Sequence, residues 1–246
     1  MRITVVGCSG SFPGPDAPSS CYLVEHDGSR MLLDMGNGSL GALQRYTDIY
    51  GIDGVIISHL HVDHFIDLCS YYVALRYRPG GGVPPVPVWG PPGTAGRLTA
   101  AYGLGGASAM NGEMDFHVAR DAFTVGPFSI RTAPVVHPVA SRAIRVEAGG
   151  RSLTYSGDTG PTDVLTELAQ GTDLALFEAS FLSSRDNPPD LHLSGRQAAE
   201  HAAAARAGRL LLTHLVPWND SDEVLAEARE VVGDAMLASP GLTLDI

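Results

Sequence analysis

Residues 59–64 contain three histidines and one aspartate at a spacing that suits metal binding. They follow the apolar run 54–57, which predicts a buried strand. His59 and His61 are two residues apart, so in an extended segment they point to the same side and can hold one cation. Asp63 and His64 come where a predicted helix, 65–76, begins, so they face a neighbouring point. Because packing so many ionisable groups is costly without a cation, the motif predicts two adjacent metal positions.

Three further potential ligands lie at the ends of other predicted strands, where a sheet can hold a site rigidly. His137 follows Val135 and Val136, Asp158 follows the strand 152–156, and His214 closes the run 210–213. The inventory of five histidines and two aspartates fits a binuclear centre. One ion would be held by His59, His61 and His137, the other by Asp63, His64 and His214, with Asp158 bridging the two.

The ligand types indicate the metal and the reaction. Nitrogen and oxygen ligands without thiolate suit zinc, and they also suit manganese or iron. Two divalent ions about 3.5 to 4 Å apart can share a hydroxide nucleophile and stabilise the entering and leaving oxygens of a phosphoryl displacement. Hydrolysis is therefore the expected chemistry, and we count Asp63 among both the ligands and the catalytic residues.

Hydrolysis also needs a proton for the leaving group. His192 lies just before a predicted helix and is not used as a ligand, so it is the candidate general acid, with Glu178 as its orienting or proton-relay partner. The alternative is a surface histidine in a helix-capping region. His117 and His201 have no clustered partners and are predicted to be structural, and His26 is predicted to be exposed in the turn 26–29.

Length and composition place the chain among globular proteins. With 246 residues it is near the upper end for one domain, and we predict a single domain over 1–246. The hydrophobic fraction is 44%, the charged fraction is 17%, and no apolar run is long enough to cross a bilayer. The sequence starts directly with a predicted strand, 2–6, and no signal segment, which favours the cytoplasm. Three cysteines without a Cys-x-x-Cys pattern indicate free thiols.

The formal charge of −11 limits the partners. A long nucleic acid is not attracted to such an acidic chain without a compensating basic patch. A small phosphorylated substrate stays compatible, because bound metal ions would supply the local positive field.

Strand and helix patterns are gathered into two successive groups. Strands are predicted over 2–6, 21–25, 30–34, 55–58 and 86–89, with helices over 36–46, 65–76 and 94–102 and a surface loop over 79–85. A second group has strands over 116–118, 128–134, 143–147, 152–156, 174–177 and 210–213, with helices over 161–170, 194–207 and 222–232. This order favours an α/β fold, a four-layer αββα sandwich of two similar halves.

The ligand pattern resembles the metal set of the metallo-β-lactamase superfamily, over essentially the whole chain. Glu178 and His192 resemble the ribonuclease Z-like branch of that superfamily. Segments 7–11, 40–45, 155–160 and 188–195 look like an actinobacterial group that includes an atypical cyclic nucleotide phosphodiesterase. The resemblance implies the αββα fold, a dinuclear zinc site, phosphodiester hydrolysis and a homodimer.

Two departures separate this chain from other members of the superfamily. Ribonuclease Z carries an extended arm for tRNA between the ligands that match His137 and Asp158, whereas only twenty residues lie between them here. Class B β-lactamases typically use a cysteine at the second metal, and here no cysteine follows Cys69. The departures favour a small substrate over tRNA.

The expected function is therefore a metal-dependent phosphodiesterase for a small substrate, with a 3′,5′-cyclic nucleotide such as cAMP as the first candidate. The alternatives are a tRNA 3′ endonuclease, a lactone or ester hydrolase, and a metal-binding sensor without turnover. Four features have no assigned role at this point: the loop 7–15, Arg76, Arg78 and Trp218.

Overall fold

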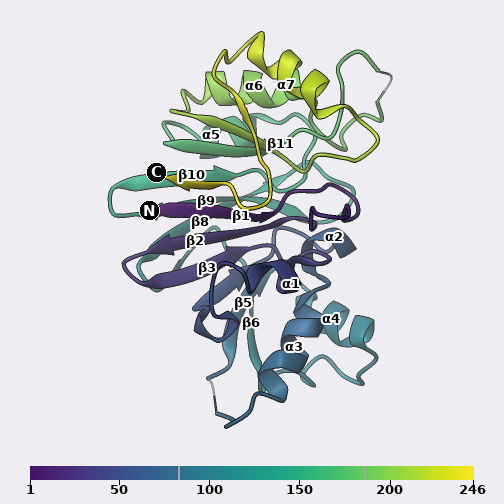
Figure 1. Ribbon diagram of the computed structural model, residues 1–246, viewed down its shortest axis with the longest axis vertical. Helices are drawn as coiled ribbons and strands as arrows, with labels where there is room; N and C mark the ends of the chain where they lie inside the picture. Colours follow the sequence, from purple (N-terminus) through teal and green to yellow (C-terminus); the bar gives the residue numbers. More distant parts are fainter. Residues whose placement is uncertain (83, 186) are drawn as a thin grey trace.

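Two seven-stranded sheets pack face to face in the computed structural model, which describes residues 1–82, 84–185 and 187–246 (Figure 1). The first sheet has the order β14-β1-β2-β3-β4-β5-β6, and β3 to β6 run parallel. Its strands are β1 (Arg2–Gly7), β2 (Cys21–His26), β3 (Ser29–Leu33), β4 (Gly54–Ile56), β5 (Val86–Gly90), β6 (Met114–Val118) and β14 (Thr243–Asp245).

The second sheet has the order β13-β12-β11-β10-β9-β8-β7. Strands β10 to β13 are parallel, and β9 is antiparallel to both of its neighbours, β8 and β10. The strands of this sheet are β7 (Ala122–Val125), β8 (Phe128–Val135), β9 (Ser141–Ala148), β10 (Arg151–Tyr155), β11 (Leu174–Glu178), β12 (Leu210–Thr213) and β13 (Met236–Leu237).

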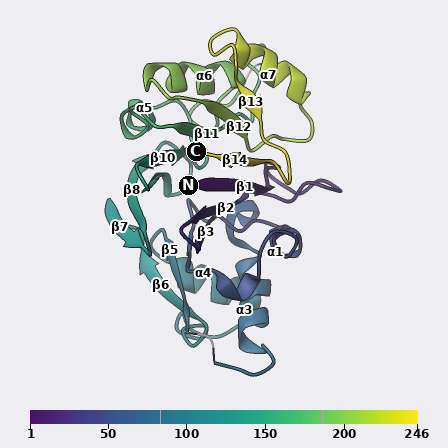
Figure 2. The same cartoon turned by 60° about the vertical axis from the view of Figure 1, so that its left-hand side comes forward.

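Helices cover the outer face of each sheet (Figure 2). The first sheet carries α1 (Ser39–Leu43), α3 (Leu68–Arg76) and α4 (Thr94–Tyr102), with the short α2 (Val62–Phe65) at its edge; the second carries α5 (Asp163–Leu168), α6 (Gly195–Ala204) and α7 (Ser221–Arg229). Apolar side chains fill three layers, one between the sheets and one under each set of helices. Adjacent residues Leu32 and Leu33 of β3 belong to different layers, as strand alternation requires. The predicted αββα sandwich is confirmed.

Several element boundaries differ from the prediction. The helix predicted over 36–46 is the shorter α1, which starts after Gly38, a residue with a φ of 80°. The helix predicted over 65–76 is divided into α2 and α3, and α2 begins after an extended His61, so Asp63 and His64 lie inside a helix. Strands β7, β13 and β14 were not predicted, because segments of four, two and three residues are too short to show alternation.

The predicted hairpin after β2 is confirmed, but the prediction for His26 is wrong. The turn residues Asp27 and Gly28 have φ angles of 49° and 83°, which a two-residue hairpin of this type needs. His26 ends β2, and only 18% of its side chain is exposed, because the neighbouring Gly149 lies against its ring. Val83, which falls in the loop predicted over 79–85, lies outside the described residues.

The strand directions bring many polar residues to one edge of the sandwich. Strands β1, β3 and β4 end at the same edge of the first sheet, and β8, β10, β11 and β12 end together in the second. The residues that follow these strands, including His59, His137, Asp158 and His214, therefore meet where the two sheets face each other. Among the described residues, no helix is both long and apolar enough to cross a membrane.

Candidate metal centre

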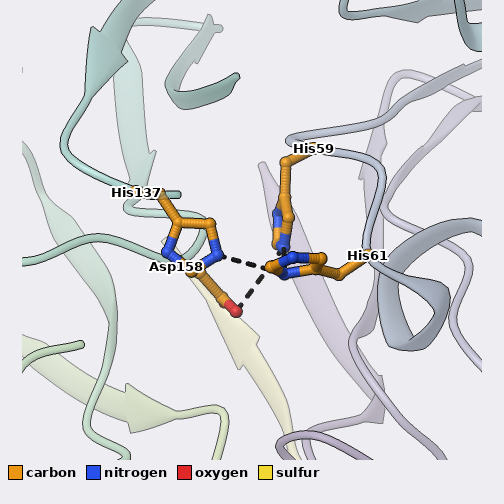
Figure 3. Close-up of side chains that lie close together, drawn as sticks. All are labelled: His59, His61, His137 and Asp158. Atoms are coloured by element: carbon orange, nitrogen blue, oxygen red, sulfur yellow. Dashed lines mark hydrogen bonds and ion pairs between the residues drawn. The ribbon is translucent and has the colours of Figure 1, made fainter. Parts of the chain in front are cut away.

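The first ligand cluster joins three imidazoles and one carboxylate (Figure 3). Nε2 of His59 lies 3.1 Å from Nδ1 of His61, which in turn lies 3.1 Å from Nε2 of His137. Oδ2 of Asp158 is 3.6 Å from Nε2 of His59. The three rings and the carboxylate point toward one another, although they come from both halves of the fold. These four residues are able to hold one metal ion.

The second cluster also contacts Asp158. Nε2 of His214 is 3.2 Å from Nε2 of His64 and 3.1 Å from Oδ2 of Asp63. Oδ1 of Asp158 lies 3.3 Å from Nε2 of His64, and its Oδ2 lies 3.3 Å from Nε2 of His214. One carboxylate therefore reaches both clusters.

Hydrogen bonds to Asp34 fix the protonation of two of the histidines. Oδ2 of this buried carboxylate lies 2.7 Å from Nδ1 of His64, and a carboxylate can only accept, so Nδ1 of His64 carries the proton. The Ser58 hydroxyl donates to the same oxygen at 2.8 Å. It must therefore accept from Nδ1 of His59, 3.1 Å away. In both rings Nε2 is left with its lone pair toward the cluster.

Other hydrogen-bond partners fix the protonation of two more histidines in the same way. Nδ1 of His137 donates to the carbonyl oxygen of Leu191 at 3.0 Å. The Ser180 hydroxyl donates to Glu178 at 2.8 Å, so it accepts from Nδ1 of His214, also at 2.8 Å. All four tautomers therefore present an unprotonated Nε2 to the clusters, and a metal-binding imidazole needs an unprotonated nitrogen directed at the ion.

Burial makes these groups costly unless a cation compensates them. Asp158 is 2% exposed, and among the described residues its Oδ1 has no hydrogen-bond partner. A buried carboxylate oxygen without a partner costs free energy that a metal ion would recover. The unpaired oxygen and the converging lone pairs both fit a divalent metal ion.

The pKa shifts agree with a site of neutral imidazoles and ionised carboxylates. Burial lowers the pKa of His59 well below its usual range and also lowers the pKa of His61 and His137. Burial acts to raise the pKa of Asp63, but its contacts with His214 and His64 outweigh this effect and lower it. His64 differs, because Asp158 and Asp34 overcome burial and raise its pKa.

His192 and Glu178 form a buried pair beside both clusters. Nδ1 of His192 donates to Oε1 of Glu178 at 2.9 Å, and the same oxygen accepts from the backbone N–H of Thr159 at 2.8 Å. Burial lowers the pKa of His192, but Glu178 outweighs it and raises the pKa to about 9. Only 13% of the His192 side chain is exposed, so the alternative of a surface histidine is wrong. Its Nδ1 lies 4.0 Å from Asp158.

The family follows from a comparison with known sequences. A family model described as the beta-lactamase superfamily domain matches residues 29–215. The chain belongs to the beta-lactamase superfamily. The resemblance that the ligand pattern suggested is thereby confirmed, and with its His/Asp clusters the chain is a metallo-hydrolase of this superfamily.

Relatives in the superfamily cover nearly the whole chain. A protein of Mycobacterium leprae is 43% identical over 258 residues, which cover 100% of this chain and 89% of the relative. A ribonuclease Z of Mycobacterium bovis is 30% identical, with coverage of 88% and 86%. The crystal structure of the metallo-β-lactamase fold protein YhfI from Bacillus subtilis has a TM-score of 0.90 at 27% identity and covers 99% of each chain.

Other residues singled out in the sequence make contacts outside the two ligand clusters. Arg76 pairs with Glu113 at 2.9 Å, and Arg78 lies over the ring of Tyr50, 4.4 Å from its centroid. His117 contacts Asp115 and stacks on Trp89, and His201 bonds to Thr166. Trp218 is 56% exposed and packs against Phe12. Neither arginine is bonded to a member of the two clusters.

The residues that orient the ligand histidines were not predicted from the sequence. Asp34 accepts from Ser58, His64 and Tyr155, and Ser180 links His214 to Glu178. One signal for Asp34 was available, since an aspartate directly after the apolar run 31–33 lies at the same strand edge as the ligands. Ser180 and Tyr155 gave no comparable signal, because their roles depend on contacts across long sequence separations.

The loop 7–15, left without a role by the sequence, contacts the second cluster. The backbone N–H of Ser11 donates to Oδ2 of Asp63 at 2.8 Å. A Cβ on Gly10 would lie 2.7 Å from the carbonyl oxygen of His214, and a Cβ on Gly36 would overlap the carbonyl of Asp63. The two glycines therefore allow neighbouring loops to approach the ligands closely.

Proposed function

We propose that the protein is a dinuclear, metal-dependent phosphodiesterase that acts on a small phosphodiester, with a 3′,5′-cyclic nucleotide as the first candidate. His59, His61 and His137 would hold one ion, Asp63, His64 and His214 the other, and Asp158 both. The donor set of nitrogens and oxygens favours zinc. Because both sheets supply ligands, we further propose that residues 1–246 work as one domain.

The observation that carries the proposal is the His192–Glu178 pair beside a carboxylate shared by two ligand clusters. When bound, the metal ions would supply Lewis-acid stabilisation of the phosphoryl oxygens and a nucleophilic water. Protonated His192 would keep its Nδ1 proton, which is hydrogen-bonded to Glu178, and would donate its Nε2 proton to the leaving alkoxide. Glu178 is held by Thr159 and Ser180, so it fixes the ring while the proton moves.

The connection between His137 and Asp158 supports a small substrate. It consists of β9, a turn at Gly149 and Gly150, and β10, so no arm extends from the fold at this place. Such an arm is the part that ribonuclease Z uses for tRNA. The net charge of −11 also disfavours a long polyanion.

A second candidate is cleavage of RNA 3′ ends, which the Mycobacterium bovis relative named ribonuclease Z favours. The relative is 30% identical and covers most of the chain, so its named activity deserves a direct assay. Rates on a tRNA precursor and on cyclic nucleotides, measured with the same enzyme and metal, separate the two candidates.

The test is a substrate panel with defined metals, comprising cyclic nucleotides, a tRNA precursor, a generic phosphodiester and lactones. We expect the highest kcat/KM for a cyclic nucleotide. His192→Ala should keep both metals and lose about 100-fold or more in kcat. Preferential turnover of a lactone, or full activity of this variant, would contradict the proposal.

Metal content tests the shared carboxylate separately from turnover. Asp158→Ala removes a carboxylate that reaches both clusters, so the metal stoichiometry should fall. Elemental analysis of the purified variant measures it. Two tightly held ions per chain would refute the bridging role.

A further inference from the structure

Two exposed aromatic side chains come from segments that lie next to the second ligand cluster. Phe12 is 49% exposed and Trp218 is 56% exposed, and their ring centroids are 5.8 Å apart at an angle of 38°. Neither ring belongs to the three apolar layers formed by the described residues. The pair therefore contributes little to the core, and its exposure needs another explanation.

Hydrogen bonds join the segments that carry both rings to the ligand Asp63 and to residues that adjoin or contact the ligand His214. Ser11, which precedes Phe12, donates its N–H to Asp63, and the N–H of Gly10 donates to the carbonyl of Leu215 at 3.0 Å. On the other side, Asn219, which follows Trp218, donates from Nδ2 to the carbonyl of Ser180 at 2.8 Å. Because these segments are already held in place, a ligand that binds to the rings would lose little free energy to ordering them.

The segments that carry the pair, 7–15 and 215–219, contain no lysine or arginine. Val62 lies between two ligand residues in the chain and is 47% exposed. The chain contains no lysine, and Arg185, which is near this turn, is bonded to the side chain of Asn219 at 2.7 Å. An exposed aromatic pair on segments without basic residues suits a planar neutral ring better than a second phosphate.

We propose that Phe12 and Trp218 form a stacking subsite for the nucleobase of the substrate, next to the metal centre that would bind its phosphodiester. The inference rests on the proposed phosphodiesterase activity and names the substrate class as nucleoside phosphodiesters. Stacking on aromatic side chains accepts any base, because every base has a π face. The subsite therefore selects nucleotides over ring-free phosphodiesters and discriminates weakly among bases.

Kinetics on two matched substrates test the subsite. One is 3′,5′-cyclic AMP, and the other is the cyclic phosphate of 1,3-propanediol, which has the same six-membered phosphate ring without a nucleoside. In Trp218→Ala and Phe12→Ala we expect KM for cyclic AMP to rise about tenfold with kcat nearly unchanged, because ground-state and transition-state binding are lost equally. Both parameters for the ring-free substrate should stay as they are.

Matched variants control for indirect effects. Tyr77 is 73% exposed at the end of α3 and lies in a different part of the fold, so Tyr77→Ala should leave both substrates unaffected. Trp218→Phe keeps a flat ring and should restore most of the affinity. If the double alanine variant changes the molar mass in light scattering while KM stays constant, the pair is a protein interface and the inference is wrong.

A binding measurement separates this inference from the proposed activity. The chain has two tryptophans, and Trp89→Phe leaves Trp218 as the only fluorophore of that kind. In the metal-loaded protein, AMP should quench Trp218 fluorescence, whereas ribose 5-phosphate should not. Quenching by AMP without turnover of any phosphodiester would support the subsite and reject the activity. Turnover of cyclic AMP with no quenching and unchanged KM in the alanine variants would reject the subsite.

Discussion

At the scale of single residues, Asp34 organises much of the site, although it belongs to neither ligand cluster. It is completely buried with a φ of 58°, and it accepts from the Ser58 N–H, the Ser58 hydroxyl, His64 and the Tyr155 hydroxyl at 2.7 to 2.8 Å. Through these bonds it sets the tautomers of His59 and His64. A residue that binds no metal thus determines which nitrogen two ligands present.

Asp34→Asn should weaken metal binding more than its small change in shape suggests. The amide has one oxygen, so its NH2 group must face a donor that the carboxylate now satisfies. We expect metal affinity to fall about 10- to 100-fold, with a loss of about 2 kcal/mol in the free energy of unfolding. Ser58→Ala is the control, because it leaves the hydrogen bond that His64 donates to Asp34 intact and should cost less. Equal metal affinity in Asp34→Asn and the unmodified protein would contradict this role.

The pH dependence of turnover should reveal the His192–Glu178 pair. The pKa of His192 is raised to about 9, so the acid form is present below that pH and kcat should fall as the pH rises through it. Glu178→Gln removes the negative charge that raises the pKa. The falling limb of the kcat profile should then move to lower pH, while the metal content is retained. A limb at the same pH in both proteins would show that another group donates the proton.

At the scale of elements, the site depends on loops that approach one another closely after parallel strands. Gly36, in the loop between β3 and α1, lies against the carbonyl of Asp63 in α2 with no room for a Cβ. Backbone contact of this kind fixes the position of α2, and α2 carries two members of the second cluster.

Gly36→Ala should therefore displace α2, whereas Gly41→Ala should not. A Cβ on Gly41, an exposed residue of α1, meets no atom within 4 Å, so alanine there should be neutral or stabilising by up to about 1 kcal/mol. For Gly36→Ala we expect a loss of about 2 kcal/mol or more and a reduced occupancy of the second metal. Chemical denaturation and metal analysis measure both effects. Similar results for the two variants would argue against close packing at Gly36.

The elements also show what sequence patterns can and cannot predict. Strongly apolar strands such as β1, β11 and β12 were predicted within one residue, and the layer order followed from them. The residues that the structure brings together in both clusters were also singled out in the sequence, because each lies in a segment that follows a predicted strand. Short edge strands, the break between α2 and α3, and the bonds of Ser180 escaped prediction, because they depend on tertiary contacts.

At the scale of the whole molecule, the two clusters join the halves of the sandwich. The residues His59 to His64 follow β4 of the first sheet, whereas His137, Asp158 and His214 follow strands of the second. A metal ion in either cluster would be bound by both halves at once. Binding to the folded state only would therefore stabilise the entire fold.

Removal of metal should lower the melting temperature. An ion present at a hundredfold excess over its dissociation constant adds about 2.7 kcal/mol, which corresponds to a rise of about 5 to 10 °C for a chain of this size. Calorimetry of the protein after chelation and after addition of zinc measures the difference. The Asp158→Ala variant should show a smaller response to zinc. Identical melting temperatures with and without metal would argue against a site shared by the two halves.

The shared site also predicts how the protein would behave if it were cut in two. A division between β6 and β7 would leave three histidines and one aspartate of the clusters on one fragment, and two histidines and one aspartate on the other. Neither fragment would contain a complete ligand cluster, yet β14 on the second fragment is the pairing partner of β1 on the first. A divalent ion would therefore act as a chemical trigger for reassembly, and recovered hydrolysis would report that the two fragments had met.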